Sequence, residues 1–457
     1  MTRRWAPHAL AALLFAAYAA LSVTNHLRMR TTGYDLGIFE QAIRGYAEGR
    51  APVSELKAPG FHLLGDHFHP VLMLLAPFYK LFPSPLTILV AQAFLFALSV
   101  LPVARLAVRT LGHRRGLAVG TAYGLSWGVQ QAVDFDFHEI AFAVPLLAFA
   151  MEALADGRWR RAVLFAVPLL LVKEDLGLTL AAVGGYLILR RQRALGAVAV
   201  AVGLAGTALT ALVVIPAFNP AGTYAYGADG DHLAGLDAKA WMLFALLAPT
   251  LFLAVRSPLV LVAVPTVALR LWSTTPNHWS THFHYDAVLM PILFVALVVV
   301  LGRMRPARTG RLAVGVLGLA LAIAATQPLA GLLTPAAWRV TPEVAAVRAA
   351  LDRIPDGAVV AADNRLVPQL TARCQVFRYP EVPAGVRPDW IVTVDGPIGS
   401  GAPPAGPDAG YEVVDRAGGL TVLRRTPIDG QPHPPTVHDE RSATTITRGV
   451  TLRPTGS

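Results

Sequence analysis

The polar segment after the first apolar run contains residues that could perform acid–base chemistry. Asp35 stands in Gly33-Tyr34-Asp35-Leu36-Gly37, where the two glycines let a ligand approach the backbone closely. An aspartate in such a loop can accept a proton from a hydroxyl group or coordinate a cation. It can equally cap a helix that begins at Leu36, because aspartate is a favourable N-cap residue. The spacing alone leaves both roles open.

Two histidines in the same segment have a spacing that suits a metal or a phosphate. His67 and His69 lie on one side of an extended stretch, with Asp66 beside them. Neutral imidazole binds divalent metals, whereas protonated imidazole donates hydrogen bonds to phosphate. The pair does not specify a metal site, so no resident cofactor is predicted, although a divalent cation is compatible with the spacing. The alternative role is to anchor the apolar helix that begins at Pro70.

Three further polar clusters interrupt an otherwise apolar sequence. They are Phe137-His138-Glu139, Lys173-Glu174-Asp175 and His282-Phe283-His284-Tyr285. Ionisable groups at membrane depth are costly and therefore indicate function. The lysine cluster could instead be a neutralised hairpin tip, and aromatic residues at a membrane interface need no function. We expect the ionisable residues of these clusters to meet Asp35 in one site.

The elements that must position these residues are membrane helices. The chain is 54% hydrophobic and 15% charged, well below the quarter or so of charged residues in soluble proteins. Residues 1–335 are predicted to form an α-helical polytopic domain with about 11 transmembrane helices, because apolar runs of spanning length recur. The predicted spans are 9–24, 86–108, 116–133, 139–154, 161–173, 176–190, 194–216, 239–255, 258–272, 285–302 and 312–331.

The loop charges predict the orientation of these spans. Arginine-rich connectors alternate with connectors rich in acids and histidines, and the arginine-rich side is expected to be cytoplasmic, together with the N-terminus. The first outer loop is then 25–85. Its apolar stretch 71–82 falls short of the ~20 residues needed to span, so we expect a re-entrant or interfacial helix. The net charge of +10 comes mostly from arginines in these connectors. They do not form a basic stripe, so no nucleic-acid partner is expected.

The composition changes after the last predicted span. Residues 338–425 predict a small extracytoplasmic α/β domain with a helix over 342–354, strands over 358–362 and 389–394, and a hairpin over 411–425. Residues 426–457 are rich in Pro, Thr and Ser and are predicted to be a disordered tail. The single cysteine, Cys374, excludes an intrachain disulfide.

This organisation resembles the GT-C superfamily of polyprenyl-phosphate-sugar-dependent glycosyltransferases. The chain is also similar to a family of predicted bacterial membrane proteins, domain of unknown function two-thousand-and-seventy-nine. That resemblance covers roughly residues 10 to 400 and is carried by Tyr34-Asp35-Leu36-Gly37-Ile38-Phe39-Glu40-Gln41 and by the three polar clusters named above. The closer family implies no activity. The usual paired-acid motif of the superfamily is not cleanly present here.

The GT-C resemblance implies an inverting sugar transfer at the outer leaflet of the plasma membrane. Membrane lipid, a polyprenyl-phosphate-linked sugar and an envelope acceptor would be its partners, and Asp35 would act as the general base. Groups that hold the lipid phosphate would come from His67, His69, Lys173, His282 and His284. The other candidate substrate-binding residues are Glu40, His138, Glu139, Glu174, Asp175 and Tyr285.

Two other functions fit parts of the sequence. An ion-coupled transporter or flippase would explain the Lys173-Glu174-Asp175 cluster within a broken hairpin. Transporters often contain inverted repeats, and the two halves of this chain contain no matching half-spans. A non-catalytic membrane scaffold would use the outer α/β domain to bind an envelope partner.

Overall fold

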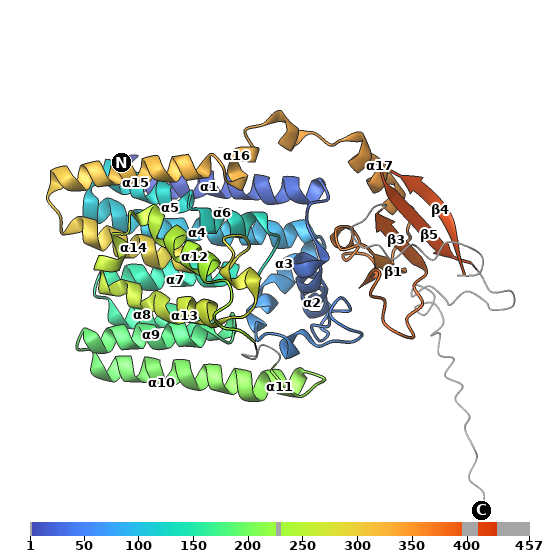
Figure 1. Cartoon of the computed structure of the whole chain (residues 1–457), viewed down its shortest axis with the longest axis horizontal. Coiled ribbons are helices and arrows are strands. Elements are labelled where there is room, and N and C mark those ends of the chain that lie inside the picture. Colours follow the sequence, from blue (N-terminus) through green and yellow to red (C-terminus); the bar gives the residue numbers. More distant parts are fainter. Residues whose placement is uncertain (1, 225–229, 395–409, 427–457) are drawn as a thin grey trace, which may run out of the picture.

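The computed structural model describes residues 2–224, 230–394 and 410–426 as a helical bundle with a small sheet domain at one end (Figure 1). The helices of the bundle are α1 (Thr2–Leu27), α4 (Pro85–Leu111), α5 (His113–Gly124), α6 (Trp127–Asp134), α7 (Ile140–Ala155), α8 (Trp159–Ala166), α9 (Leu176–Leu189), α10 (Arg193–Leu209), α11 (Ile215–Phe218), α12 (Leu236–Leu247), α13 (Val264–Trp272), α14 (Leu289–Gly302), α15 (Pro306–Ala324) and α16 (Pro328–Gly331). The predicted helical membrane architecture is therefore present.

Four helical segments in the described part of the chain are long and apolar enough to cross a membrane. They are Trp5–Leu27, Pro85–Leu111, Arg193–Phe218 and Pro306–Ala324. Five shorter apolar helical segments accompany them: Pro70–Leu81, Ile140–Ala155, Leu176–Leu189, Pro258–Trp272 and Leu289–Gly302. The predicted span 116–133 is divided between α5 and α6. The count of about 11 crossings therefore stays a prediction, since it depends on counting short or broken helices as spans.

Two short helical segments meet at the lysine cluster, as the sequence predicts. The helix α8 continues into the 3₁₀ segment η4 (Val167–Leu171), and α9 begins after Asp175. Pro168 lies at this change of helix type. Proline lacks the N–H that an α-helix needs, so it favours the change. The turn from Val172 to Asp175 therefore presents three ionisable side chains between two apolar helices.

Facing glycines allow α9 and α10 to pack closely. A Cβ atom added to Gly184 would lie 2.6 Å from the carbonyl oxygen of Gly196, and one on Gly203 would lie 2.4 Å from that of Gly177. Small residues permit such backbone approach between membrane helices. This contact fixes α10 against α9, the helix that begins directly after the lysine cluster.

The segment 25–85, which the sequence predicts as the first outer loop, contains its own helices. Its elements are η1 (Gly33–Gly37), α2 (Ile38–Ala47), η2 (Leu63–Gly65), η3 (Pro70–Leu75) and α3 (Ala76–Leu81). The stretch that the sequence predicts as an interfacial helix is helical over 70–81. It exposes Met73, Leu74, Phe78 and Leu81, as an interfacial helix would.

The sheet domain combines α17 (Pro342–Leu351) with five strands in the order β2-β1-β3-β5-β4. The strands are β1 (Val359–Ala362), β2 (Gln375–Arg378), β3 (Trp390–Val394), β4 (Tyr411–Ala417) and β5 (Leu420–Arg425). The sequence predicts all of these strands except β2. That strand has only two central apolar residues, Val376 and Phe377, between polar neighbours. Except for Thr426, the predicted disordered tail lies outside the described residues.

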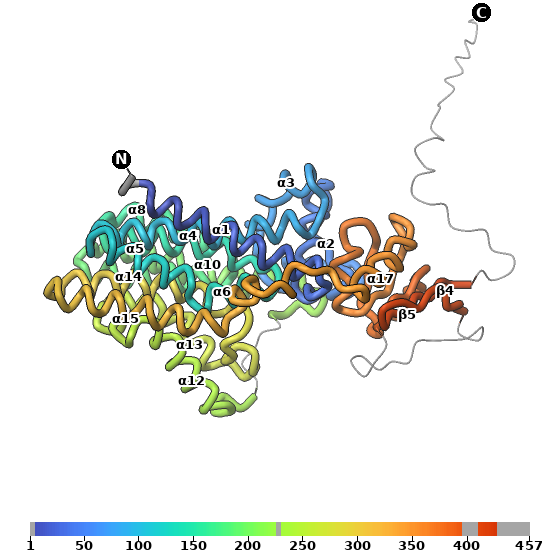
Figure 2. Tube along the Cα trace, turned by 90° about the horizontal axis from the view of Figure 1, so that it is seen from above, coloured from blue at the N-terminus to red at the C-terminus, as the bar shows by residue number. Residues whose placement is uncertain are grey.

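The sheet domain contacts the outer loop at the segment that carries Asp35. The backbone N–H of Gly33 donates to the carbonyl oxygen of Asn364 at 2.7 Å, and that of Tyr34 donates to Asn364 Oδ1 at 3.1 Å. Gln41 Nε2 donates to the carbonyl oxygen of Val376 at 2.9 Å. Figures 1 and 2 both show α2 beside the sheet domain. The domain therefore holds the backbone immediately before Asp35.

Glu40 lies inside this contact. Tyr79 Oη donates to Glu40 Oε1 at 2.8 Å, and the Thr371 hydroxyl donates to Oε2. The side chain is fully buried between α2, α3 and the sheet domain. Burial raises the pKa of the Glu40 carboxyl to about 7, although both hydrogen bonds and the Arg44 charge oppose this shift. Glu40, expected from the sequence to contact substrate, thus has both carboxylate oxygens bonded to protein groups, and the substrate contact stays a prediction.

The raised pKa of Glu40 predicts that unfolding depends on pH. Because the folded carboxyl keeps its proton up to about pH 7, its stabilising contribution is complete below the ordinary pKa of 4.5 and is lost as pH rises through 7. We expect the unfolding free energy to fall by on the order of 3 kcal/mol across this window. Glu40→Gln should remove that component and unfold at a higher temperature than the parent protein at pH 8.

Thermal unfolding in detergent at pH 5 and pH 8 measures this effect. Glu412→Gln is the control, because Glu412 is an exposed acid in the sheet domain paired with Arg424. The control should keep the pH dependence of the parent protein. An unchanged pH dependence in Glu40→Gln would contradict the assigned protonation state.

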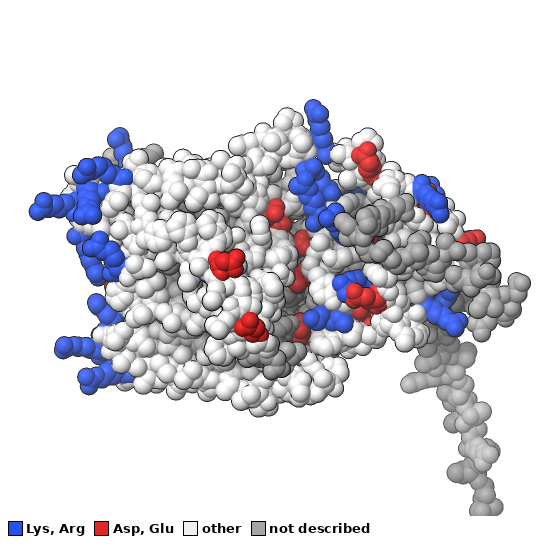
Figure 3. All heavy atoms as spheres, viewed as in Figure 1, with Lys and Arg blue, Asp and Glu red and all other residues white. Residues whose placement is uncertain are grey.

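Basic side chains are concentrated at one end of the bundle. Figure 3 shows Lys and Arg gathered at the end farther from the sheet domain. The helix junctions rich in arginine are α4–α5, α7–α8, α9–α10 and α14–α15. The acid-and-histidine clusters lie at the opposite ends of these helices, so the bundle has one basic end and one end with mixed ionisable groups.

Candidate functional site

Asp35 lies in η1, between the bundle and the sheet domain. Its side chain is partly exposed, and its loop is tied on the other side by Thr32, whose N–H and hydroxyl both donate to Asp136 Oδ2 at 2.9 and 2.8 Å. Burial raises the pKa of Asp35, while the charges of His138 and Lys173 lower it and that of Glu139 raises it. A carboxylate with a raised pKa is a stronger base once it is ionised.

His138 is positioned by Gln92 from the middle of the bundle. The backbone N–H of His138 donates to Gln92 Oε1 at 2.9 Å, and Gln92 Nε2 donates to the carbonyl oxygen of Asp136. Phe39 packs edge-on against the imidazole, with the ring centres 5.2 Å apart. One fully buried amide thus fixes the short loop that precedes α7.

His284 belongs to a loop that Arg270 holds in place. Arg270 Nε donates to the carbonyl oxygen of His278 at 2.8 Å, and its terminal nitrogens reach Ser280 and the carboxylate of Asp286. His284 itself is buried, and neither ring nitrogen has a hydrogen-bond partner in the described part of the chain. Burial and the nearby charges of His138 and Lys173 hold the pKa of His284 well below its ordinary value.

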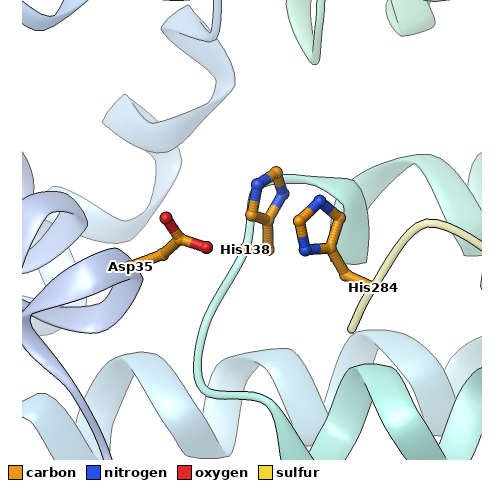
Figure 4. A group of neighbouring side chains, drawn as sticks. All are labelled: Asp35, His138 and His284. Carbon is orange, nitrogen blue, oxygen red and sulfur yellow. The ribbon is translucent and has the colours of Figure 1, made fainter. Parts of the chain in front are cut away.

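Asp35, His138 and His284 form a group that we call the acid–imidazole trio. Figure 4 shows Asp35 and His284 on opposite sides of His138. A nitrogen or oxygen atom from each residue lies within 4.8 Å of the others, and the two imidazoles stack with ring centres 3.4 Å apart. Zinc ligands at ~2.0 Å from the ion lie about 3.3 Å from one another. The trio could therefore hold a divalent cation after a rotation of the stacked rings.

Without such a rotation, the trio is suited to proton and phosphate chemistry. The lone pairs of stacked rings point side by side instead of converging on one ion. If one of the two imidazoles gained a second proton, it could donate a hydrogen bond to an oxyanion while the other ring stayed neutral. The unpartnered nitrogens of His284 are then available to a ligand oxygen.

Lys173 and Glu139 extend the trio toward the lysine cluster. Lys173 Nζ lies 3.3 Å from Glu139 Oε1, and His138 Nδ1 lies 2.8 Å from Glu139 Oε2. The second distance permits an ion pair, although the ring N–H is not aimed for a hydrogen bond. Glu139 is fully buried, and so its charge needs the Lys173 ammonium as a partner. Lys173 remains partly exposed and is available to a ligand.

Glu174 connects the lysine cluster to the first outer loop. Its Oε1 is 2.7 Å from His67 Nδ1 and accepts from Tyr224 Oη at 3.0 Å, and its Oε2 accepts from the Phe68 N–H at 3.1 Å. A buried carboxylate with three donors is well satisfied. Glu174 therefore orients His67, and Lys173 is the member of the cluster with a side chain directed to the trio.

The structure brings together most of the residues expected in the site. His69 is buried against Phe39, and Asp175 is packed beside Lys173. Tyr285 lies next to His284, with ring centres 4.2 Å apart. His282 is exposed and lines a neighbouring cavity instead. Glu40 belongs to the contact with the sheet domain, as described above.

Sequence reasoning missed several residues that position the site. They are Gln92, Asp136, Arg270, Asp286 and Asn364. Arg270 and Asp286 could have been found, because each is a lone charge at the edge of a predicted apolar span. Gln92 gives no such signal, since a single amide in a long helix fits many roles.

The family comparison matches most of the chain. Residues 25–394 match a family described as predicted membrane protein, DUF2079. The chain belongs to this family. The resemblance expected from the four sequence motifs is therefore confirmed. No curated protein matches this DUF2079 chain.

Solved structures with a similar fold include ArnT from Cupriavidus metallidurans. The crystal structure of ArnT bound to undecaprenyl phosphate superposes with a TM-score of 0.55 at 15% identity, and covers 90% of the DUF2079 chain and 97% of ArnT. The apo structure of ArnT has the same TM-score and coverage at 16% identity. The chain therefore has an ArnT-like fold, and the GT-C resemblance stays a prediction.

Proposed function

We propose that this protein transfers a sugar from a polyprenyl-phosphate donor to an envelope acceptor at the outer face of the plasma membrane. The observation that carries the proposal is the position of Asp35, which has a carboxylate oxygen within 4.8 Å of ring nitrogens of His138 and His284. Glu139, which contacts His138, also holds Lys173. A base, a fixed cation and imidazoles are the groups that such a transfer needs. The fold supports the lipid donor, because ArnT has this architecture and was crystallised with undecaprenyl phosphate.

In the proposed reaction, Asp35 removes the proton from an acceptor hydroxyl. The hydroxyl oxygen forms a bond to the anomeric carbon of the donor sugar, and the bond from that carbon to the phosphate oxygen breaks. The phosphate oxygen leaves with the bonding electron pair, and the proton stays on Asp35. Inversion at the anomeric carbon follows from this single displacement.

The leaving phosphate gains negative charge, so stabilising it contributes most to the rate. Lys173 supplies a cation that Glu139 holds in position, and the neutral ring of His284, whose nitrogens have no partner in the described part of the chain, can donate its single N–H to a phosphate oxygen. His67, oriented by Glu174, is on the side of the first outer loop. These groups come from three connectors at the same end of the bundle.

The orientation in the membrane is part of the proposal. The basic end would face the cytoplasm, and the N-terminus would lie on that side. The end with Asp35 and the sheet domain would face outward, which brings the site to the leaflet where a lipid-linked sugar and an envelope acceptor can both be reached. If the short helices are counted as spans, the chain crosses the membrane eleven times. An odd number of crossings puts the N-terminus and the sheet domain on opposite sides, as proposed.

The test is a transfer assay with the protein reconstituted in liposomes that contain a polyprenyl-phosphate sugar. Mass spectrometry should detect a glycosylated acceptor together with polyprenyl phosphate, with and without a chelator to determine whether the trio needs a cation. Proton-dependent counterflow of a solute without consumption of the lipid-linked sugar would instead favour the transporter. If removal of the cluster charges changes neither sugar transfer nor counterflow, the result would favour the scaffold.

A further inference from the structure

A polar cavity lies beside the proposed site. It has a volume of about 500 Å³ and is enclosed by the C-terminal end of α1, by α6, and by α16 with the 3₁₀ segment η10 (Pro335–Trp338) that follows it. This volume is in the range of small-molecule sites. His282 lines the cavity, whereas His284, two residues later, belongs to the acid–imidazole trio. The loop between them therefore separates two distinct sites.

Two arginines line this cavity without using their charge elsewhere. Neither Arg28 nor Arg30 donates a side-chain hydrogen bond or forms an ion pair within residues 2–224, 230–394 and 410–426. Both come directly after α1, where the chain turns toward η1. A guanidinium that lines a cavity and has no protein partner is well suited to bind a phosphate, because its planar N–H groups match phosphate oxygens.

The amide side chains of the cavity already have partners. Asn25 Nδ2 donates to Asp134 Oδ1 at 2.8 Å, and Gln131 Nε2 donates to Gln327 Oε1 at 2.9 Å. Asp134 is the acid that lines the cavity, so two guanidinium groups against one carboxylate leave one positive charge. The cavity consequently favours an anion, and a monoanionic phosphate diester would balance its charge.

The surroundings of the cavity are apolar and exposed. Leu333 is 87% exposed and Trp338 is 60% exposed, both next to the cavity wall. Leu27 is exposed at the end of the candidate span Trp5–Leu27. Tryptophan and leucine in this position fit a membrane interface, where the head group of a lipid would lie beside them. The cavity is thus at the level where a span ends.

We infer that this cavity binds the phosphate of an anionic lipid head group, with Arg28 and Arg30 holding the phosphate oxygens. The acyl chains would leave the cavity along the apolar surface near Leu27 and Leu333. Phosphate esters that are free in solution share the same chemistry, and the test distinguishes the two sources. This inference does not depend on the proposed sugar transfer, because it uses none of the residues of the trio.

Lipid retention measured by native mass spectrometry tests this inference. The purified protein is delipidated and then given phosphatidylglycerol or diacylglycerol with the same acyl chains, so that the two probes differ in the phosphoglycerol head group. We expect phosphatidylglycerol to be retained and diacylglycerol to be lost. The double variant Arg28→Gln/Arg30→Gln should weaken phosphatidylglycerol binding at least about tenfold, because charge-assisted hydrogen bonds are removed.

The matched control is Arg339→Gln, which removes one exposed positive charge outside the cavity. It should bind phosphatidylglycerol as the parent protein does. Competition with glycerol 3-phosphate identifies the source: displacement of the lipid assigns the site to the phosphate group itself, and no displacement assigns it to a membrane-embedded head group. Both results keep the phosphate assignment.

Equal retention of the two lipids by the parent protein would overturn the inference. Unchanged phosphatidylglycerol binding in the double variant would overturn it as well. If the double variant unfolds at a lower temperature than the parent protein, the single variant Arg30→Gln replaces it, because Arg30 is exposed and its loss leaves the fold intact. That variant should bind phosphatidylglycerol several-fold more weakly, and unchanged binding would again reject the site.

Discussion

Asp35→Asn is expected to lower sugar transfer by about 10²–10⁴-fold, the usual contribution of a general base. Asparagine keeps the shape of the side chain and the backbone contacts of Gly33 and Tyr34 with Asn364, but it cannot take a proton. Binding of the lipid donor should change little, so the loss should appear in kcat. Initial rates in the liposome assay, at saturating donor, measure this loss.

The pH dependence distinguishes a base from a residue that only positions the substrate. Because the pKa of Asp35 is raised, the parent protein should become more active as pH rises through that pKa and then reach a plateau. This rise should be absent from the residual activity of Asp35→Asn. Asp352→Asn is a matched control, since Asp352 is exposed in the sheet domain at the end of α17. Full activity of Asp35→Asn rejects the proposed role.

Lys173→Met is expected to slow the transfer by about 10²–10³-fold, comparable to the loss of one donor that stabilises an oxyanion. Methionine preserves the length of the apolar stem but removes the charge that faces the leaving phosphate. The affinity for polyprenyl phosphate should fall in the same variant, because the product carries the charge that Lys173 would bind. Product inhibition by added polyprenyl phosphate measures that affinity.

A purely structural role for Lys173 has to be separated from a catalytic one. Glu139 is fully buried, so loss of its lysine partner leaves a carboxylate that is poorly compensated. The double variant Lys173→Met/Glu139→Gln removes both charges and should restore the unfolding temperature without restoring the rate. Recovery of the rate in the double variant would contradict the catalytic role. Lys80→Met, at an exposed lysine of α3, should behave as the parent protein.

The sequence was sufficient to predict which connectors meet. Acids and histidines recur in alternate connectors of an apolar chain, and alternate connectors of a helical bundle lie at the same end. This rule brings Asp35, His138, Lys173 and His284 together without any knowledge of the packing. The strands of the sheet domain other than β2 were also predicted, because short buried runs bounded by turns have few alternative structures.

The individual partners could not be predicted, since they depend on contacts between distant segments. Glu40 is buried because Thr371 reaches it from 331 positions later in the chain. His282 is exposed and lines the neighbouring cavity, whereas His284 is buried in the trio, and the conformation of their loop is held by Arg270. Neither contact leaves a periodic pattern in the sequence. The number of spans does not follow from the sequence either, because short helices and interruptions divide the apolar runs.

The hydrogen bonds from Gly33 and Tyr34 to Asn364 have a consequence for biosynthesis. The bond from Tyr34 joins residues 330 positions apart, and Asn364 lies beyond the last helix of the bundle. A ribosome must therefore translate almost the whole described chain before the loop around Asp35 can acquire its final support. In a partly synthesised protein the loop around Asp35 would lack this support, so the proposed sugar transfer should begin only after the sheet domain has been made.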